Sequence, residues 1–341
     1  MGVDERHDHS LRVPRPDLSE ALGTPNACNR CHTSMTNTWA AKKIEAWFGE
    51  GRRSEPHWGS AIHAGQSNAL GSEAKLLEIL SDPQIPGIAR ATAILLLPRF
   101  VSPRSLPAFS QLIGDEDPLV RTAALEALDG FPPELRVALA ASSLADPIRS
   151  VRFESARILA SVSDPQLGSS APQLHAVLSE YRDALKKDAD RAEPHMQLGA
   201  VALSQGQLDL AQKEYELART RNPSFVPAYV NLADLYRVRG MDSEGEKILR
   251  AALEIVPDQP DVRHALGLLM VRSDRLDKAL IELEFAARER PDNPRYAYVF
   301  AVALHTSGNI AQARSVLRKA SAEHPADRDL AAFLASLEQR E

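Results

Sequence analysis

The chain has few cysteines and few aromatic side chains. Of its 341 residues only Cys28 and Cys31 are cysteines, and Phe, Trp and Tyr together make up 5%. Two cysteines exclude a disulfide-rich framework and a zinc site with four cysteine ligands from this chain. The formal net charge is −6, so the basic excess typical of nucleic-acid binding is absent. No apolar run approaches the roughly 18 residues that a membrane-spanning helix needs.

The two cysteines stand in one short motif, Cys28-Asn29-Arg30-Cys31-His32. C-x-x-C-H is the pattern by which a c-type haem is attached. Each thiol can form a thioether with one vinyl group of the same porphyrin, and the neighbouring imidazole can bind the iron. The motif therefore predicts one covalent haem c, with Cys28 and Cys31 as attachment residues and His32 as an axial iron ligand.

Other interpretations of the motif stay open. A zinc site would use the two thiolates and His32 with a further ligand, although the usual finger spacing is missing. A disulfide or redox pair between Cys28 and Cys31 is another alternative, although no strand pattern precedes them as in thioredoxin-like proteins. Under these alternatives the chain is a non-redox scaffold whose C-x-x-C-H binds zinc or nothing.

The second axial ligand of the iron has several candidates. Met35 follows the motif too closely for the local chain to reach the opposite haem face. His9 lies on a proline-rich arm that could fold over the porphyrin, which makes it the first candidate. His63 is the next, and His57, His7 and a ligand from outside the chain remain alternatives.

A 34-residue repeat fills the C-terminal half of the chain. Its columns are Pro223, Pro257, Pro291, Pro325; Ala218, Ala252, Ala286, Ala320; Tyr215, Leu249, Leu283, Leu317; and Gly199, Ala233, Gly267, Ala301. The pattern resembles the tetratricopeptide repeat (TPR) and predicts four two-helix hairpins over residues 192–325. Residues 326–341 then read as a helix that caps the last apolar face.

A second repeat with another period lies upstream. Arg90, Arg121 and Arg152 are 31 residues apart, and an Asp-Pro pair precedes each of them. Asp followed by Pro is a helix-start signal. The pattern resembles HEAT repeats over residues 72–162, and residues 163–191 are expected to hold a joint and a half-repeat helix. The predicted fold is all-α, a small irregular haem-binding segment at 1–71 followed by an α-solenoid.

The segment 1–71 carries neither repeat. Its prolines and Gly23 predict irregular chain before the motif, and apolar residues at helical spacing predict a helix over residues 38–48. Trp39, Trp47 and Phe48 could pack on a haem or dock this helix onto the first HEAT unit. Both alternatives remain open.

Residues 8–17, 24–32 and 39–40 together resemble bacterial multihaem c-type cytochromes that carry HEAT and TPR repeats behind the haem domain. That resemblance implies several C-x-x-C-H motifs, export to the periplasm and haems with two histidine ligands. It implies Cys28, Cys31 and His32 as attachment residues and proximal ligand, and His9 as the distal ligand. Only one motif is present, so we expect further haem motifs upstream of Met1.

The expected function is that of an extracytoplasmic electron-transfer protein whose solenoid docks redox partner proteins or peptide segments. Residues 1–7 are polar and give no export signal, so we expect the chain to be a C-terminal fragment, a processed form or the product of a misplaced start. No nucleophile–base set, phosphate-binding glycine loop or paired carboxylates point to an enzyme. The alternatives are the non-redox scaffold and, for the intact protein, a multihaem oxidoreductase.

The first helix of each TPR unit is expected to line a concave groove. Its surface is mixed in chemistry, and its two histidines are expected to be solvated rather than metal ligands. The predicted groove residues are Met196, Ala200, Val230, Asp234, Arg237, His264, Leu268, Tyr298, Val302 and His305.

Overall fold

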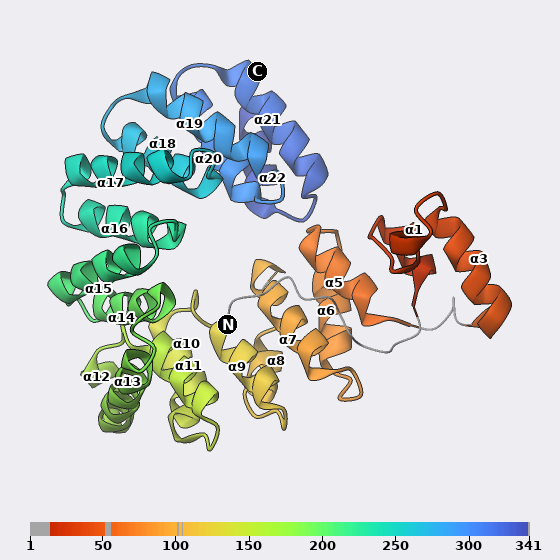
Figure 1. Ribbon diagram of the computed structural model, residues 1–341, viewed down its shortest axis with the longest axis horizontal. Helices are drawn as coiled ribbons and strands as arrows, with labels where there is room; N and C mark the ends of the chain where they lie inside the picture. The colour runs from red at the N-terminus through yellow and green to blue at the C-terminus, as the bar shows by residue number, and fades with distance from the viewer. Residues whose placement is uncertain (1–13, 52–55, 101, 104, 340–341) are drawn as a thin grey trace. The chain divides into compact units, whose positions relative to one another are not determined.

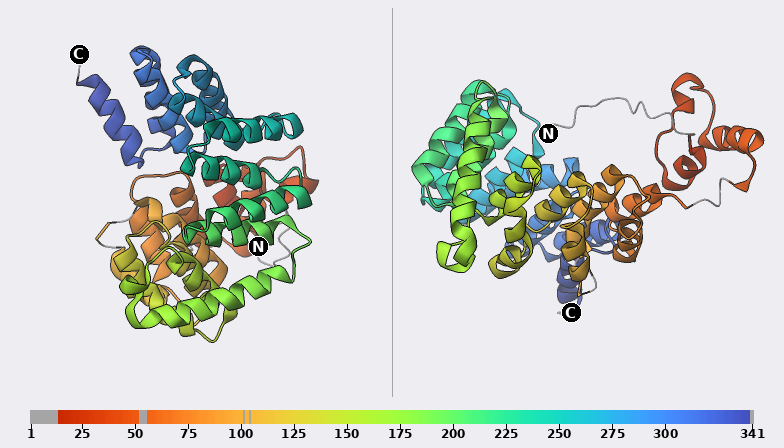
Figure 2. Two further views of the ribbon diagram at one scale, coloured as in Figure 1. Left: turned by 90° about the vertical axis from the view of Figure 1, so that its left-hand side faces the viewer. Right: turned by 90° about the horizontal axis from the view of Figure 1, so that it is seen from below.

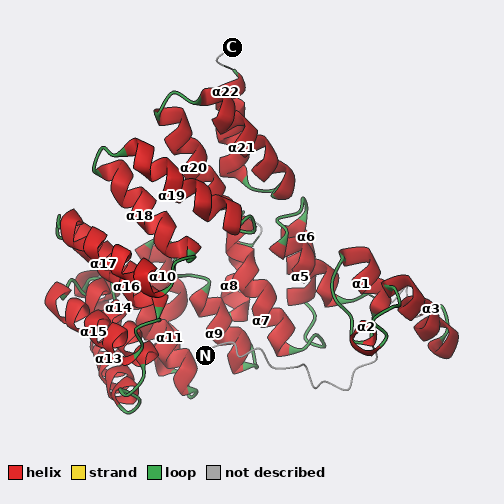
Figure 3. Ribbon diagram, turned by 45° about the horizontal axis from the view of Figure 1, so that its top comes forward, coloured by secondary structure: helices red, strands yellow, loops and turns green. Residues whose placement is uncertain are grey.

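The computed structural model describes residues 14–51, 56–100, 102–103 and 105–339, and all regular structure in them is helical (Figure 3). The chain divides into two compact units, residues 1–64 and 65–341. Within the described residues, no helix is both long and apolar enough to cross a membrane. The predicted all-helical solenoid is confirmed, and it occupies the second unit.

The first unit is built on α1 (Pro16–Leu22), α2 (Cys28–Cys31) and α3 (Asn37–Phe48), and α5 (Trp58–Gln66) runs from it into the second. The prediction that the proline-rich segment is irregular is wrong for α1. Proline is favourable at a first helical position, because its missing N–H has no partner there anyway, and Pro16 takes that place. Gly23 ends the helix in the left-handed conformation at φ 69°.

The HEAT part of the second unit is a row of short paired helices, drawn from orange to yellow-green in Figure 1. Leu76, Ile94, Phe109, Leu125 and Leu128 are almost fully buried between them. The helices are α6 (Ser72–Leu80), α7 (Gly87–Leu96), η1 (Leu97–Phe100), α8 (Leu106–Leu112), α9 (Pro118–Glu126), α10 (Pro133–Ala140), η2 (Ala141–Ala145) and α11 (Arg149–Leu159).

The arginines of the 31-residue period link neighbouring HEAT repeats. Arg121 donates to both carboxylate oxygens of Asp146 in the next repeat, at 2.8 and 3.0 Å, and to the carbonyl of Asp115 at 2.8 Å. Arg152 donates in the same way to Glu180 at 3.0 Å and to the carbonyl of Asp146 at 2.8 Å. Because a guanidinium presents several donors in one plane, a single side chain can join two repeats.

The segment that follows the HEAT part is helical over residues 164–186. Ser163 and Gln166 form a capping box at the start of α12, which satisfies backbone N–H groups that the first helical turn leaves without partners. The elements are α12 (Asp164–Leu167), η3 (Gly168–Ser170) and α13 (Ala171–Lys186).

The TPR part consists of four hairpins and a final helix, and its helices lie side by side in Figure 2. Pro260 and Pro294 occupy helix N-terminal positions, as their fixed φ favours. The helices are α14 (Ala192–Ser204), α15 (Leu208–Arg221), α16 (Val226–Val238), α17 (Asp242–Ile255), α18 (Pro260–Arg272), α19 (Leu276–Glu289), α20 (Pro294–Thr306), α21 (Ile310–Glu323) and α22 (Arg328–Glu338).

Small residues let the two helices of a hairpin approach closely. A Cβ atom on Gly199 of α14 would lie 2.4 Å from the Tyr215 ring of α15, and one on Gly267 would lie 2.7 Å from Leu283. The equivalent position of the second hairpin is Ala233, which is buried in one core with Leu249. The column of small residues seen in the sequence therefore sets the spacing within each hairpin.

We predict that Gly199→Ala destabilises the chain although alanine is the better helix former. Overpacking against Tyr215 costs about 1–3 kcal/mol, which exceeds the roughly 1 kcal/mol gained in helix propensity. The double variant Gly199→Ala/Tyr215→Leu reproduces the pair found in the second hairpin, so it should be more stable than the sum of the two single changes. Urea unfolding of the four proteins measures this coupling, and additive effects would contradict the close approach.

Candidate functional site

The C-x-x-C-H motif forms a single helical turn in the first unit. Cys28 and Cys31 are the first and last residues of α2, and neither is in a disulfide. Residues three apart on a helix share a face, so both thiols lie on one side of this turn. Asn26 caps it, because its Oδ1 accepts from the backbone N–H groups of Cys28 at 2.9 Å and Asn29 at 3.2 Å.

His32 directly follows this turn. Its backbone N–H donates to the Cys28 carbonyl at 2.9 Å. Its ring lies against Trp39 of α3, with centroids 4.9 Å apart and the planes at 53°. Asn26 Nδ2 donates to Asn37 Oδ1 at 2.5 Å. The motif and its imidazole are therefore held against α3 by one ring contact and one side-chain hydrogen bond.

The candidate second ligands of the iron lie in different parts of the chain. His9 and His7 lie outside the described residues, and His63 lies on α5. His57 uses Nδ1 to accept from Gly59 at 3.0 Å and stacks on Trp58. Across the described residues, no three His, Cys, Asp or Glu side chains gather closely enough to hold a metal ion.

Exposed aromatic surface stands at the C-terminal end of α3. Trp47 and Phe48 at the end of α3 are 70% and 54% exposed, and Met35 is 42% exposed. Ala40, Ala41 and Ile44 are the buried face of the same helix. The two aromatic side chains therefore lie outside the core of the first unit.

A second candidate site lies in the TPR part, where the first helices of three hairpins border a cavity of about 350 Å³. This volume falls in the range of sites that hold small ligands or side chains. Five of the predicted groove residues, Val230, Asp234, Arg237, His264 and Leu268, are among its lining. The other lining residues are Asn231, Ala233, Leu249, Asp261, Ala265, Leu269, Arg272, Arg295 and Tyr296.

The expectation that His264 is solvated is wrong. Its side chain is buried, with 8% exposed, and its ring stacks on Tyr296 at a centroid distance of 4.2 Å. Burial and, to a smaller extent, the positive charge of Arg295 lower the pKa of His264 to about 4. His264 is therefore neutral near pH 7, and its Nδ1 is buried without a hydrogen-bond partner among the described residues.

Two hydrogen-bonded pairs flank this histidine. Tyr296 donates its hydroxyl to Asp261, and burial together with this carboxylate raises the pKa of Tyr296. Arg237 pairs with Asp234 at 2.7 Å. Tyr296 and Asp261 were not among the predicted groove residues. The signal that could have found Tyr296 is its departure from the repeat, because the equivalent residues are Val262 and Ala228.

A third feature joins the two ends of the second unit. The Ala326 N–H donates to the Asn68 carbonyl at 2.9 Å, and His324 Nε2 lies 2.7 Å from the Pro291 carbonyl. A carbonyl only accepts, so Nε2 carries the proton, and Nδ1 of the neutral ring accepts from Asn68 Nδ2 at 3.1 Å.

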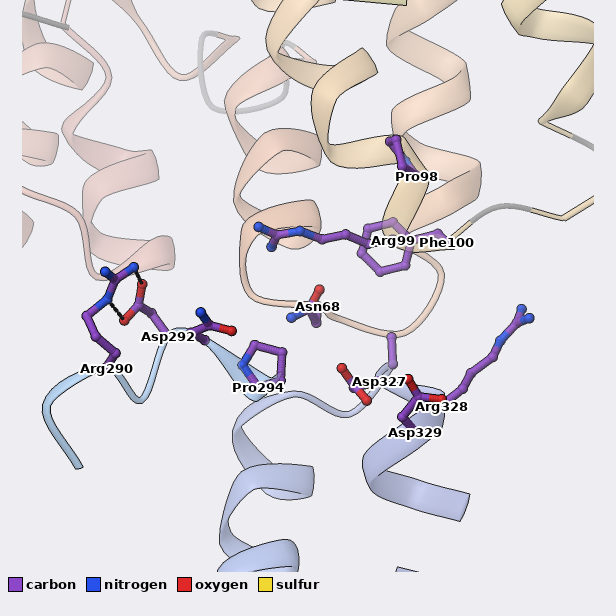
Figure 4. A pocket seen from close by; sticks show the side chains of 12 residues that line it. Asn68, Pro98, Arg99, Phe100, Arg290, Asp292, Pro294, Asp327, Arg328 and Asp329 are labelled. Carbon is purple, nitrogen blue, oxygen red and sulfur yellow. Dashed lines mark hydrogen bonds and ion pairs between the residues drawn. The ribbon is translucent and has the colours of Figure 1, made fainter. Parts of the chain in front are cut away.

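A cavity of about 530 Å³ lies beside this contact (Figure 4). Its charged groups include Arg99 and the ion pair between Arg290 and Asp292 at 2.9 Å. Asn68, from the loop after α5, faces Pro294 and Asp327 of the TPR part across it.

Comparison with known proteins identifies both repeat types. Residues 73–160 match the HEAT repeat family, and residues 202–269 and 270–337 match the tetratricopeptide repeat family. The chain therefore contains HEAT and TPR repeats, and it is a repeat scaffold of the class that acts in protein interaction. These matches support a repeat scaffold more than an electron-transfer protein, because they do not extend to the C-x-x-C-H segment.

Particular proteins resemble parts of the chain. The CTR9 homolog of Arabidopsis thaliana is 28% identical over 114 residues, which are 33% of this chain and 10% of that protein, so the chain spans about a tenth of its length. Yeast Tom70 is 17% identical with a TM-score of 0.51, covering 84% of this chain and 57% of its own. A TPR protein of Thermus thermophilus is 22% identical with a TM-score of 0.41, covering 50% and 93%. The structural likeness to Tom70 supports the helical-repeat fold alone.

We predict that His264 makes the chain acid-sensitive. Its folded pKa of about 4 lies below the ordinary 6.5, so the unfolded chain binds the proton first as the pH falls. Above pH 6.5 His264 is mostly neutral in both the folded and the unfolded chain, and the free energy of unfolding is highest there. Between pH 6.5 and pH 4 the unfolded chain alone binds the proton, so the free energy of unfolding falls progressively. Between pH 7 and pH 5 the loss is roughly 2 kcal/mol.

The variant His264→Phe keeps a ring on Tyr296 and removes this titration, so its unfolding free energy should fall less between these pH values. The control is Tyr298→Phe, which changes another ring of the TPR part that contacts Phe333 and leaves His264 in place, so it should leave the pH dependence almost as in the wild type. Urea unfolding at both pH values gives the comparison. An equal loss in His264→Phe and wild type would contradict the assignment.

Proposed function

We propose that this chain docks a peptide segment of a partner protein in the concave groove formed by α16, α18 and α20. The cavity at His264 carries the proposal. It combines apolar side chains, which can cover a partner's apolar residues, with charged and hydrogen-bonding groups that can orient its backbone and side chains.

The arrangement of the lining supports a segment rather than a small metabolite. The lining residues come from three successive hairpins, so the surface continues along the array. A rigid row of helices also needs little reordering on binding, which leaves more of the interaction energy for affinity.

Peptides selected from a random phage-displayed library on the wild-type chain test this proposal. Ala265→Trp fills the cavity without changing charge, and it should weaken the selected peptides at least about tenfold by removing their apolar contacts. The matched control is Ile281→Trp on α19, where the side chain is 66% exposed and distant from the lining. Equal binding to both variants would refute docking in this groove.

A second candidate function rests on the first unit. We propose that Cys28 and Cys31 carry one covalent haem c, and that His32 supplies an axial nitrogen. The observation that favours it is the geometry of α2, where two thiols outside any disulfide share one face and an imidazole follows directly. A bound haem would supply a one-electron redox centre.

The residues present fit this group. Both thiols lie outside any disulfide on one side of α2, and His32 follows directly. Trp39 holds the His32 ring, and the exposed Trp47 and Phe48 offer apolar surface. An extracytoplasmic location, redox partner proteins, a distal ligand at His9 and further haems upstream belong to the same proposal.

A haem-stained denaturing gel of protein made with a c-type maturation system tests the attachment. Wild type should stain and gain the mass of one haem, and Cys28→Ser/Cys31→Ser should do neither, because thioether bonds alone survive denaturation. Thr33→Ser is the control beside the motif and should stain as wild type. Unstained wild type that contains zinc would establish the scaffold alternative.

If the wild type stains, His9→Ala tests the second ligand. Loss of a ligand that completes the iron coordination changes the low-spin absorbance. An unchanged spectrum would remove His9 from the proposal and leave the attachment at the two cysteines intact.

A further inference from the structure

We infer that the groove cavity selects an acidic segment, in which a Glu or Asp side chain enters beside Arg295 and apolar residues flank it. This inference names the partner's chemistry and rests on the proposed docking in the groove. Two observations carry it: the pairing state of the charges in the cavity, and the division of its wall into polar and apolar parts.

The charged groups of the cavity are mostly engaged with one another. Its lining includes three arginines, Arg237, Arg272 and Arg295, and two carboxylates, Asp234 and Asp261. Asp234 pairs with Arg237, Asp242 outside the lining pairs with Arg272, and Asp261 accepts from the Tyr296 hydroxyl. Both lining carboxylates therefore already accept hydrogen bonds from groups of this chain.

Of the three guanidinium groups, that of Arg295 is the one without an ion-pair partner among the described residues. Arg237 is held by Asp234 at 2.7 Å, and Arg272 by Asp242 at 3.0 Å. Within the part of the chain that the structure describes, the Arg295 guanidinium has no hydrogen-bond or ion-pair partner, and its side chain is exposed. A guanidinium matches a carboxylate with two parallel hydrogen bonds, so an acidic side chain would complete this site.

The histidine beside Arg295 strengthens the match. Neutral His264 adds no charge of its own near pH 7, so the positive charge beside it is that of Arg295. The buried Nδ1 of His264 is unsatisfied, and an unsatisfied buried polar atom costs about 1–3 kcal/mol. A polar group of a bound segment that reached this nitrogen would recover part of that cost.

The apolar part of the cavity wall determines which residues of the bound segment can flank its acidic side chain. Val230, Ala265, Leu268 and Leu269 line the same cavity, and they cannot satisfy a second charged group. A segment that alternates acidic and apolar residues therefore fits, and a run of acidic residues does not.

Fluorescence anisotropy with a labelled peptide of four Glu-Leu-Ser repeats tests the inference on the full chain. The matched probe has Gln for each Glu and so keeps shape while losing charge. Wild type should bind the Glu peptide about tenfold more tightly than the Gln peptide, because a charge-assisted bidentate pair is stronger than a neutral hydrogen bond. The difference should shrink at high salt.

Arg295→Gln should weaken the Glu peptide about fivefold or more and leave the Gln peptide unchanged. The control is Arg318→Gln, which removes the same charge from a side chain that is 62% exposed on α21, outside the cavity. Because Arg295 is exposed and unpaired, its replacement should not affect folding, and unchanged thermal melting verifies this.

Two results would overturn the inference. The first is equal affinity of wild type for the Glu peptide and the Gln peptide. If Ala265→Trp then failed to bind either peptide, docking in the groove would stand and only the preference for acidic side chains would be wrong. The second is an absence of Glu-peptide binding, which refutes the acidic partner, while the peptide selection still decides independently whether the groove docks any segment.

Discussion

The solenoid depends on how closely the two helices of each TPR hairpin approach. Gly199 leaves room for the Tyr215 ring, and Gly267 leaves room for Leu283. Because the same column repeats every 34 residues, each hairpin presents its first helix in a similar orientation. The groove along α16, α18 and α20 is a consequence of that repetition.

A second constraint recurs in both kinds of repeat. Near the start of a helix, a side chain donates to a backbone carbonyl six residues earlier, which satisfies an acceptor that the loop leaves open. The pairs are Arg121 with Asp115, Arg152 with Asp146, His195 with Ala189, Tyr229 with Pro223 and Arg263 with Pro257. In the last hairpin Ala297 has no donor, and His324 bonds the Pro291 carbonyl instead. That exchange places His324 where its other nitrogen meets Asn68.

The candidate binding chemistry appears where the repeat is irregular. Tyr296 stands where the preceding hairpins have Val262 and Ala228, and its ring covers His264 and engages Asp261. Asp261 thus accepts a hydrogen bond, the imidazole is buried, and within the described residues Arg295 beside them has no ion-pair partner. A regular array would supply the groove. These few departures from the repeat give one part of the groove its proposed preference for an acidic side chain.

The sequence by itself determined the helical class, the two periods and the residues that pack the hairpins, because periodic patterns report local geometry. It also placed both thiols and His32 close together, since these residues are neighbours in the chain, but the helical turn of α2 was not predicted. The sequence wrongly predicted irregular chain at α1 and a solvated His264. Whether a proline starts a helix and whether a side chain is buried depend on tertiary neighbours, which a local sequence pattern does not identify. Only the tertiary structure decided how the charged groups of the groove cavity pair and that Asn68 meets His324, because such pairings depend on how successive repeats are rotated. That rotation sums small packing differences along the whole array.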